Sequence, residues 1–133
     1  MRFVNPIPFV SDIARSREFY RERLGLKVLK DFGSFVLFET GFAIHDGPAL
    51  EQTVWGEVSL GDERYGRRNL LLYFEHDDID AAFEAIAPHV ELIHPVERQA
   101  WGQRVFRFYD PDGHAVEIGE PLDLQASSAP QDP

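Results

Sequence analysis

Residues 110–118 read DPDGHAVEI, a tight turn followed by a short apolar strand that carries one carboxylate. Proline restricts φ and glycine permits a positive φ, so the DPDG segment predicts a turn directly before the strand. Residues 41–45 read GFAIH and align with residues 113–117, GHAVE, at an offset of 72. A repeat of this kind indicates that both copies form the same secondary-structure unit.

Two further matches in the same order extend the repeat towards the N-terminus of each copy. They align Asn5, Ile7 and Phe9 with Asn69, Leu71 and Tyr73 at an offset of 64, and Asp12-Ile13 with Asp78-Ile79 at an offset of 66. The sequence therefore predicts an α+β fold of two paired β-α-β-β-β modules. The modules cover about residues 3–46 and 69–120, with a connecting loop at about 47–68.

Local signals place the elements within each module. The first is expected to hold strands at about 3–10, 26–29, 35–39 and 42–45, with a helix that begins after Asp12 and ends at Gly25. The second is expected to hold strands at 69–74, 90–94, 105–109 and 115–118, with a helix that begins after Asp78. Because a copy of ~60 residues buries too little surface alone, we expect residues 1–122 to form one domain. Residues 123–133 are expected to be a disordered tail.

Composition restricts the classes of function. The chain has 133 residues, of which 44% are hydrophobic and 27% are charged, as in a globular domain. Its 13 basic and 23 acidic residues give a net charge of −10, which disfavours nucleic acid as a partner. The absence of cysteine excludes disulfides and thiolate zinc sites. With no long apolar run and no leader pattern, we expect a cytoplasmic protein without a membrane partner.

Four polar side chains occupy matched positions in the two copies. Asn5 matches Asn69, and His45 matches Glu117, so a pseudo-twofold axis between the modules would turn all four towards a shared cleft. Each also has a simpler interpretation, since Asn is common at strand starts and His45 precedes a turn. Glu117 is harder to explain in this way, because a carboxylate between two apolar strand residues is costly to bury unless it is paired or coordinated.

Further candidates surround this predicted cleft. Trp101 and Arg104 are pocket candidates because residues 99–102, QAWG, interrupt a strand pattern near the predicted mouth. An arginine beside aromatic residues suits an anionic or flat polar ligand. Phe106 is also a simple core candidate. The predicted cavity lining is Asn5, Phe9, His45, Asn69, Tyr73, Trp101, Arg104, Phe106 and Glu117. His76, His89 and His94 are expected at the surface, and His114 is expected to face away from Glu117.

Several segments resemble the vicinal oxygen chelate superfamily, which contains glyoxalase I, the bleomycin- and fosfomycin-resistance proteins and the extradiol dioxygenases. The segments PFVSDI at 8–13, FY at 19–20 and LGL at 24–26, with Ser16, resemble its first module. The segment DPDGHAVE at 110–117 resembles its final-strand signature. The resemblance spans about residues 3–120. It implies a cupped mixed sheet, the glyoxalase/bleomycin-resistance fold, in a protein that usually forms a homodimer.

The resemblance also implies where a metal would bind. In metal-dependent members the ligands come from the first strand of each module and from the fourth strand, and the matching positions are Asn5, His45, Asn69 and Glu117. The asparagines stand where histidine is usual. Amide oxygen is a weaker donor than imidazole for zinc, nickel or iron, so the cofactor is either none or one divalent ion such as manganese or magnesium.

We therefore predict a protein that binds a small molecule in the cavity between its modules, without the usual metal site of the family. One alternative is a divalent-metal-dependent lyase, isomerase or dioxygenase that uses His45 and Glu117 as ligands. A second is metal-free acid–base chemistry with the same two side chains as catalytic residues. A third is a structural dimeric module whose polar groups bind each other.

Overall fold

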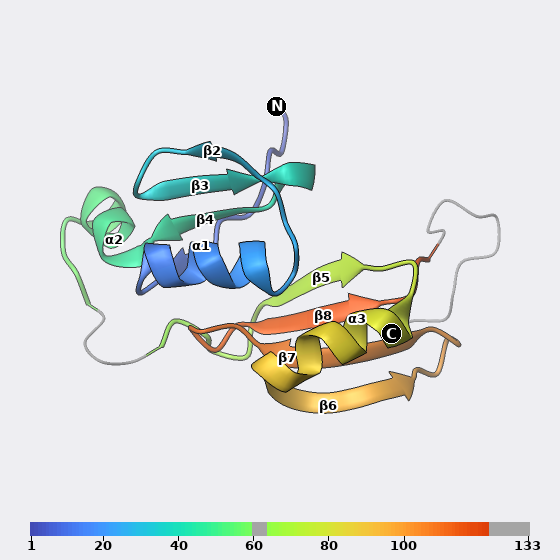
Figure 1. Cartoon of the computed structure of the whole chain (residues 1–133). Coiled ribbons are helices and arrows are strands. Elements are labelled where there is room, and N and C mark those ends of the chain that lie inside the picture. Colours follow the sequence, from blue (N-terminus) through green and yellow to red (C-terminus); the bar gives the residue numbers. More distant parts are fainter. Residues whose placement is uncertain (60–63, 123–133) are drawn as a thin grey trace. The chain divides into compact units, whose positions relative to one another are not determined.

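The computed structural model describes residues 1–59 and 64–122, which form two compact units (Figure 1). Unit 1 comprises Met1–Arg67 together with the turn Pro111–Gly113, and unit 2 comprises Arg68–Asp110 together with the chain from His114 onward. The expected single domain over residues 1–122 stays a prediction, and the expected tail at 123–133 lies outside the described residues. Within the described ranges, no helix has the length and apolar character that a bilayer crossing requires.

Unit 1 contains one four-stranded mixed sheet. Its elements are β1 (Phe9–Val10), α1 (Ile13–Glu22), β2 (Val28–Asp31), β3 (Phe35–Phe38), the 3-10 turn Glu39–Gly41, β4 (Ala43–Asp46) and α2 (Gly47–Trp55). The strand order is β1-β4-β3-β2, with β1 parallel to β4 and the other pairs antiparallel.

Unit 2 repeats this arrangement. Its elements are β5 (Leu71–Glu75), α3 (Ile79–Ile86), the 3-10 turn Ala87–His89, β6 (Glu91–Arg98), β7 (Arg104–Tyr109) and β8 (Ala115–Gly119). The strand order β5-β8-β7-β6 has the same directions as in unit 1. Phe9 pairs with His45 in unit 1, and Tyr73 pairs with Glu117 in unit 2, at the predicted offsets of 64 and 72. The prediction of two β-α-β-β-β modules is confirmed.

Both predicted helix starts are correct. The Asp12 carboxylate accepts a hydrogen bond from the backbone N–H of Arg15 at 3.0 Å, and Asp78 accepts one from Ala81 at 3.1 Å. An N-terminal turn leaves backbone N–H groups without helical partners, and a short acidic side chain supplies one. An aspartate N-cap therefore begins the main helix of each module.

One face of each sheet packs against its helix and forms the core. In unit 1 the ring of Tyr20 on α1 lies 6.0 Å from that of Phe38 on β3, and in unit 2 the ring of Phe83 on α3 lies 5.2 Å from that of Phe106 on β7. Side chains alternate along a strand, so the intervening residues face away from α1 or α3. We call this second side of each sheet its open face.

The structure corrects several predicted boundaries, of which three bear on the site. The first strand is limited to Phe9–Val10 rather than residues 3–10, because Pro6 and Pro8 lack the N–H that a ladder needs. β6 extends to Arg98, with register shifts on both sides of His94. The connection at 47–68 was predicted as a loop, but it begins with helix α2, where Pro48 in the first turn suits a helix start.

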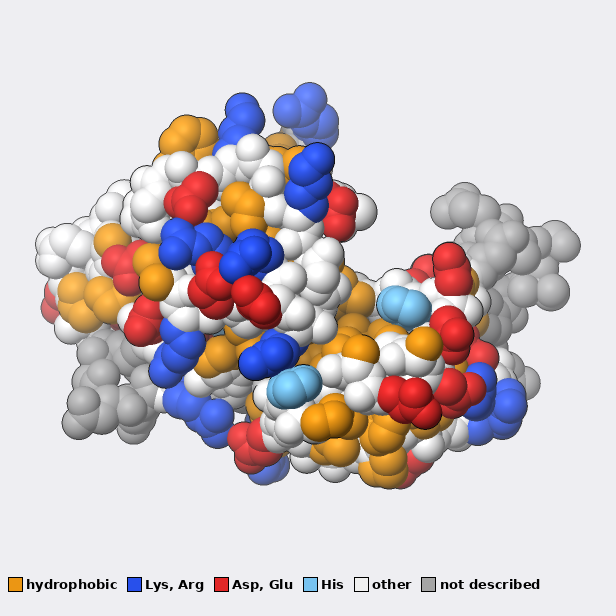
Figure 2. Space-filling view, viewed as in Figure 1, with side chains coloured by type: hydrophobic (Ala, Val, Ile, Leu, Met, Phe, Trp, Pro, Cys, Tyr) orange, Lys and Arg blue, Asp and Glu red, His pale blue; other side chains and the backbone are white. Residues whose placement is uncertain are grey.

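Charged side chains of both signs are interleaved over the exposed side of α1 (Figure 2). Arg17 pairs with Asp31 at 2.8 Å, and Arg21 pairs with Glu18 at 2.6 Å. Exposed pairs of this kind contribute little to stability, because water screens them. The candidate residues His45, Tyr73 and Glu117 lie instead on the open faces.

Candidate functional site

The open face of the sheet in unit 2 carries a buried ion pair. Glu117 on β8 is only 6% exposed, and its Oε1 accepts a hydrogen bond from Arg107 Nε on β7 at 2.7 Å. Tyr73 and Arg107 are the Cα partners of Glu117 in the two neighbouring strands, so the three side chains share one face. The buried carboxylate that the sequence indicated is therefore compensated by a guanidinium group.

Arg107 is held by two further acceptors. Its Nη1 lies 2.9 Å from His94 Nε2, and its Nη2 donates to Gln99 Oε1 at 3.3 Å. His94 Nδ1 lies 2.7 Å from the carbonyl oxygen of Pro95, which assigns the proton to Nδ1 and leaves Nε2 as an acceptor for Arg107. His94, which was expected at the surface, is half-buried, with its side chain 17% exposed. We call Glu117, Arg107, His94 and Gln99 the Arg107 cluster.

A second polar chain in unit 2 positions Tyr73. Trp101 Nε1 donates to Gln103 Oε1 at 2.9 Å, and Gln103 Nε2 donates to the Tyr73 hydroxyl at 2.9 Å. That hydroxyl donates to Glu75 Oε2 at 2.5 Å. Partial burial, reinforced by the hydrogen bond to Glu75, raises the pKa of Tyr73 to about 12. Gly119 leaves room for this chain, because a Cβ there would lie 2.5 Å from Gln103 Nε2.

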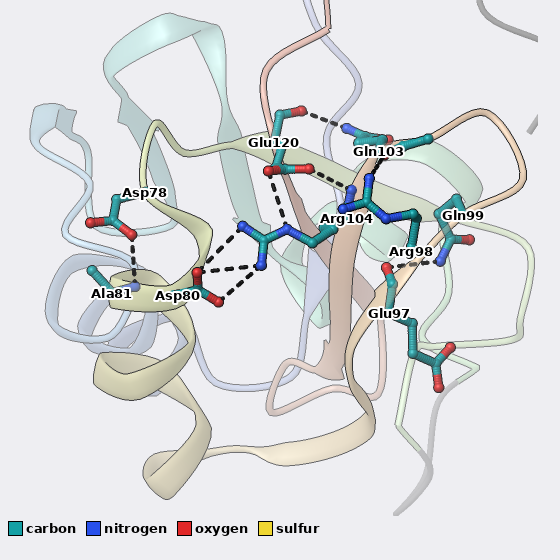
Figure 3. Close-up of polar contacts among 10 residues, drawn as sticks. Asp78, Asp80, Ala81, Glu97, Arg98, Gln99, Gln103, Arg104 and Glu120 are labelled. Atoms are coloured by element: carbon teal, nitrogen blue, oxygen red, sulfur yellow. Dashed lines mark hydrogen bonds and ion pairs between the residues drawn. The ribbon is translucent and has the colours of Figure 1, made fainter.

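Arg104 lies in a different set of contacts (Figure 3). Its guanidinium donates to Asp80 on α3 at 3.2 Å and to Glu120 Oε2 at 3.3 Å. The backbone N–H of Arg104 also donates to Glu120 Oε1 at 2.7 Å, and this bond lowers the pKa of Glu120. Phe106 packs in the core against α3. The structure therefore brings neither Arg104 nor Phe106 together with Glu117.

The remaining candidates divide between the units. In unit 1, His45 is the Cα partner of Phe9, and its Nδ1 lies 2.9 Å from the carbonyl oxygen of Asp46. Asn5 precedes β1 and donates from Nδ2 to the carbonyl oxygen of Gly41 at 3.0 Å. In unit 2, Asn69 precedes β5 and is exposed. Both asparagines thus lie outside the strands in which the sequence placed them.

The donor set does not fit a resident divalent metal ion. The Glu117 carboxylate already forms an ion pair with Arg107. The positive charge of this guanidinium would repel a metal cation at the same oxygens. Two of the four family positions are neutral amides, Asn5 and Asn69, which are weak metal donors. Over residues 1–59 and 64–122, no three His, Asp or Glu side chains gather in a group suited to a metal ion.

Comparison with known proteins gives the family. Residues 3–123 match the Glyoxalase-like domain family. This chain belongs to the glyoxalase-like domain family. Among solved structures, this glyoxalase-like chain is 76% identical to an Agrobacterium tumefaciens C58 protein of unknown function, with a TM-score of 0.87 and coverage of 92% of this chain and 95% of that one.

A more distant solved structure agrees on the fold, and a relative found by sequence matches most of the chain. A glyoxalase/bleomycin resistance protein/dioxygenase from Nocardioides is 24% identical, with a TM-score of 0.73 and coverage of 99% of this chain and 89% of that one. The uncharacterized protein YraH of Bacillus subtilis is 29% identical over 118 residues, which cover 82% of this chain and 90% of the relative. The predicted membership of the vicinal oxygen chelate superfamily, with its glyoxalase/bleomycin-resistance fold, is confirmed.

Proposed function

We propose that this glyoxalase-like chain binds a small molecule at the Arg107 cluster without a metal ion, with Arg107 as the cation of the site. The observation that carries the proposal is the 2.7 Å hydrogen bond between Arg107 Nε and the buried Glu117 carboxylate. This bond sets a positive charge against Glu117, the residue that the resemblance to metal-dependent members implies as a metal ligand.

The cluster retains unused hydrogen-bonding capacity. Each Nη atom of a guanidinium carries two N–H groups, and among the residues that the structure describes each Nη atom of Arg107 meets one acceptor, His94 for Nη1 and Gln99 for Nη2. Its side chain is 26% exposed, so the remaining N–H groups can meet a ligand oxygen. Leu71 and Tyr73, which are 47% and 41% exposed, supply apolar surface on the same open face. This combination suits a small, partly apolar molecule with a carbonyl or carboxylate oxygen.

Affinity selection tests the proposal. The purified chain is incubated with a mixed library of small carbonyl and carboxylate compounds in EDTA, and retained compounds are identified by ultrafiltration and mass spectrometry. We expect retained compounds, and we expect Arg107→Met to weaken their binding about tenfold or more, because a hydrogen bond to a charged group is lost. Arg104→Met is the matched control, since this arginine lies on the same strand but contacts Asp80 and Glu120.

Three results would overturn the proposal. Retention that requires added manganese, nickel or zinc would favour the metal-dependent enzyme with His45 and Glu117 as ligands. Equal losses in Arg107→Met and Arg104→Met would remove the role of Arg107. No retained compound at all would favour the structural module. Acid–base catalysis by His45 and Glu117, the homodimer and the cytoplasmic location stay predictions.

A further inference from the structure

Unit 1 gathers aromatic rings from three separate segments of the chain. The ring of Phe9 on β1 lies 6.0 Å from that of Trp55, at the end of α2, and 5.8 Å from that of Tyr65, with interplanar angles of 43° and 59°. Trp55 is 65% exposed. We call Phe9, Trp55, Tyr65 and His45 the aromatic platform.

Hydrogen bonds and close packing hold the Tyr65 ring in place. Its hydroxyl donates to Glu51 Oε2 at 2.7 Å, and Glu51 is only 5% exposed. The other oxygen of Glu51 accepts from the Ser59 hydroxyl at 2.6 Å and lies 3.3 Å from its backbone nitrogen. Gly47 leaves space for the ring, because a Cβ there would collide with Tyr65. These contacts therefore fix the position of the Tyr65 ring in the absence of a ligand.

His45 adds a directed acceptor to the platform. It is the Cα partner of Phe9 across the β1–β4 pair, so both side chains lie on the open face. Its Nδ1 lies 2.9 Å from the Asp46 carbonyl oxygen, which assigns the proton to Nδ1 and the lone pair to Nε2. Among the residues that the structure describes, no side chain or backbone group donates to Nε2.

We propose that the aromatic platform binds a flat aromatic or heteroaromatic ring that carries an N–H or O–H donor. The ring packs against Phe9 and Trp55, and the donor meets His45 Nε2. Aromatic rings favour offset or tilted contacts with one another, and a directed acceptor selects among flat rings by their donors. The inference goes beyond the proposed function, because it names a second class of ligand and its residues belong to unit 1 alone.

The probe is 4-nitroaniline, a flat uncharged ring with N–H donors, titrated into uniformly ¹⁵N-labelled protein. The chain has two tryptophans, so the indole N–H signals are assigned with the single variant Trp55→Leu. We expect the Trp55 signal to shift in a saturable way. The Trp101 signal serves as an internal reference, because that indole N–H is already bonded to Gln103.

Matched probes and variants distinguish specific binding of the ring from nonspecific hydrophobic binding. We expect nitrobenzene, which lacks a donor, to bind about fivefold more weakly, and cyclohexanol, which has a donor but no flat ring, to give no saturable shift. His45→Phe should weaken 4-nitroaniline to the level of nitrobenzene. Trp55→Leu, followed by ligand-detected NMR, should weaken it at least about fivefold. Phe3→Leu, which removes an 81% exposed ring outside the platform, should have no effect.

The inference fails if 4-nitroaniline causes no saturable shift of the Trp55 signal, if cyclohexanol binds as well, or if neither His45→Phe nor Trp55→Leu weakens binding. These outcomes are read separately from the library selection. Loss of library binding with an intact Trp55 response would overturn only the Arg107 site. If a library ligand binds in an Arg107-dependent way but 4-nitroaniline does not shift the Trp55 signal, only the platform is overturned.

Discussion

Replacing Arg107 by methionine tests the ion pair on which the proposed site depends. Methionine keeps an unbranched side chain on β7 but removes the guanidinium, so Glu117, whose side chain is only 7% exposed in the native chain, loses the donor at 2.7 Å. Removing one partner of a buried pair costs about 3–5 kcal/mol. Because 26% of the Arg107 side chain is exposed, water replaces part of the interaction, and we expect a loss of about 2–3 kcal/mol.

Urea unfolding followed by circular dichroism measures this loss in the free energy of unfolding. The matched control is Arg104→Met on the same strand, whose partners Asp80 and Glu120 have side chains that are 68% and 34% exposed, so we expect about 0–1 kcal/mol there. The double variant Arg107→Met with Glu117→Gln should be more stable than Arg107→Met alone, because no unpaired charge remains buried. Equal losses for the two arginine variants would refute the reasoning.

Two further predictions concern Tyr73 and Asp78. The folded pKa of Tyr73, about 12, exceeds the reference value of 10.0, so its contribution to stability is complete below pH 10 and is lost as the pH rises towards 12. Urea midpoints should therefore fall more steeply over that range in the native chain than in Tyr73→Phe, and identical slopes would contradict this. Asp78→Ala should cost about 1 kcal/mol by removing the α3 cap, whereas Asp77→Ala, at the exposed neighbouring position, should cost nothing measurable by the same unfolding assay.

Much of the fold could be predicted because its signals are local or repeated. The caps at Asp12 and Asp78 act within three residues, and strand alternation needs only neighbours. The repeat predicted the equivalence of His45 and Glu117, since two copies of one unit share one register. The same alternation separates Arg104 and Phe106 from Arg107, because residues an odd number apart on a strand face opposite sides. Glu117 pairs with Arg107, so placing Arg104 and Phe106 in one pocket with Glu117 was wrong for that reason.

The sequence by itself determined the two modules, their helix starts and the need of Glu117 for a partner, because these follow from spacing and from the cost of burying charge. Only the tertiary structure decided that this partner is Arg107 and that His94 and Gln99 hold it. Those contacts depend on the pairing of β7 with β8 and on the register shifts of β6 around His94. A shift of one residue turns a side chain to the other face of a sheet, and nothing local to His94 reveals it.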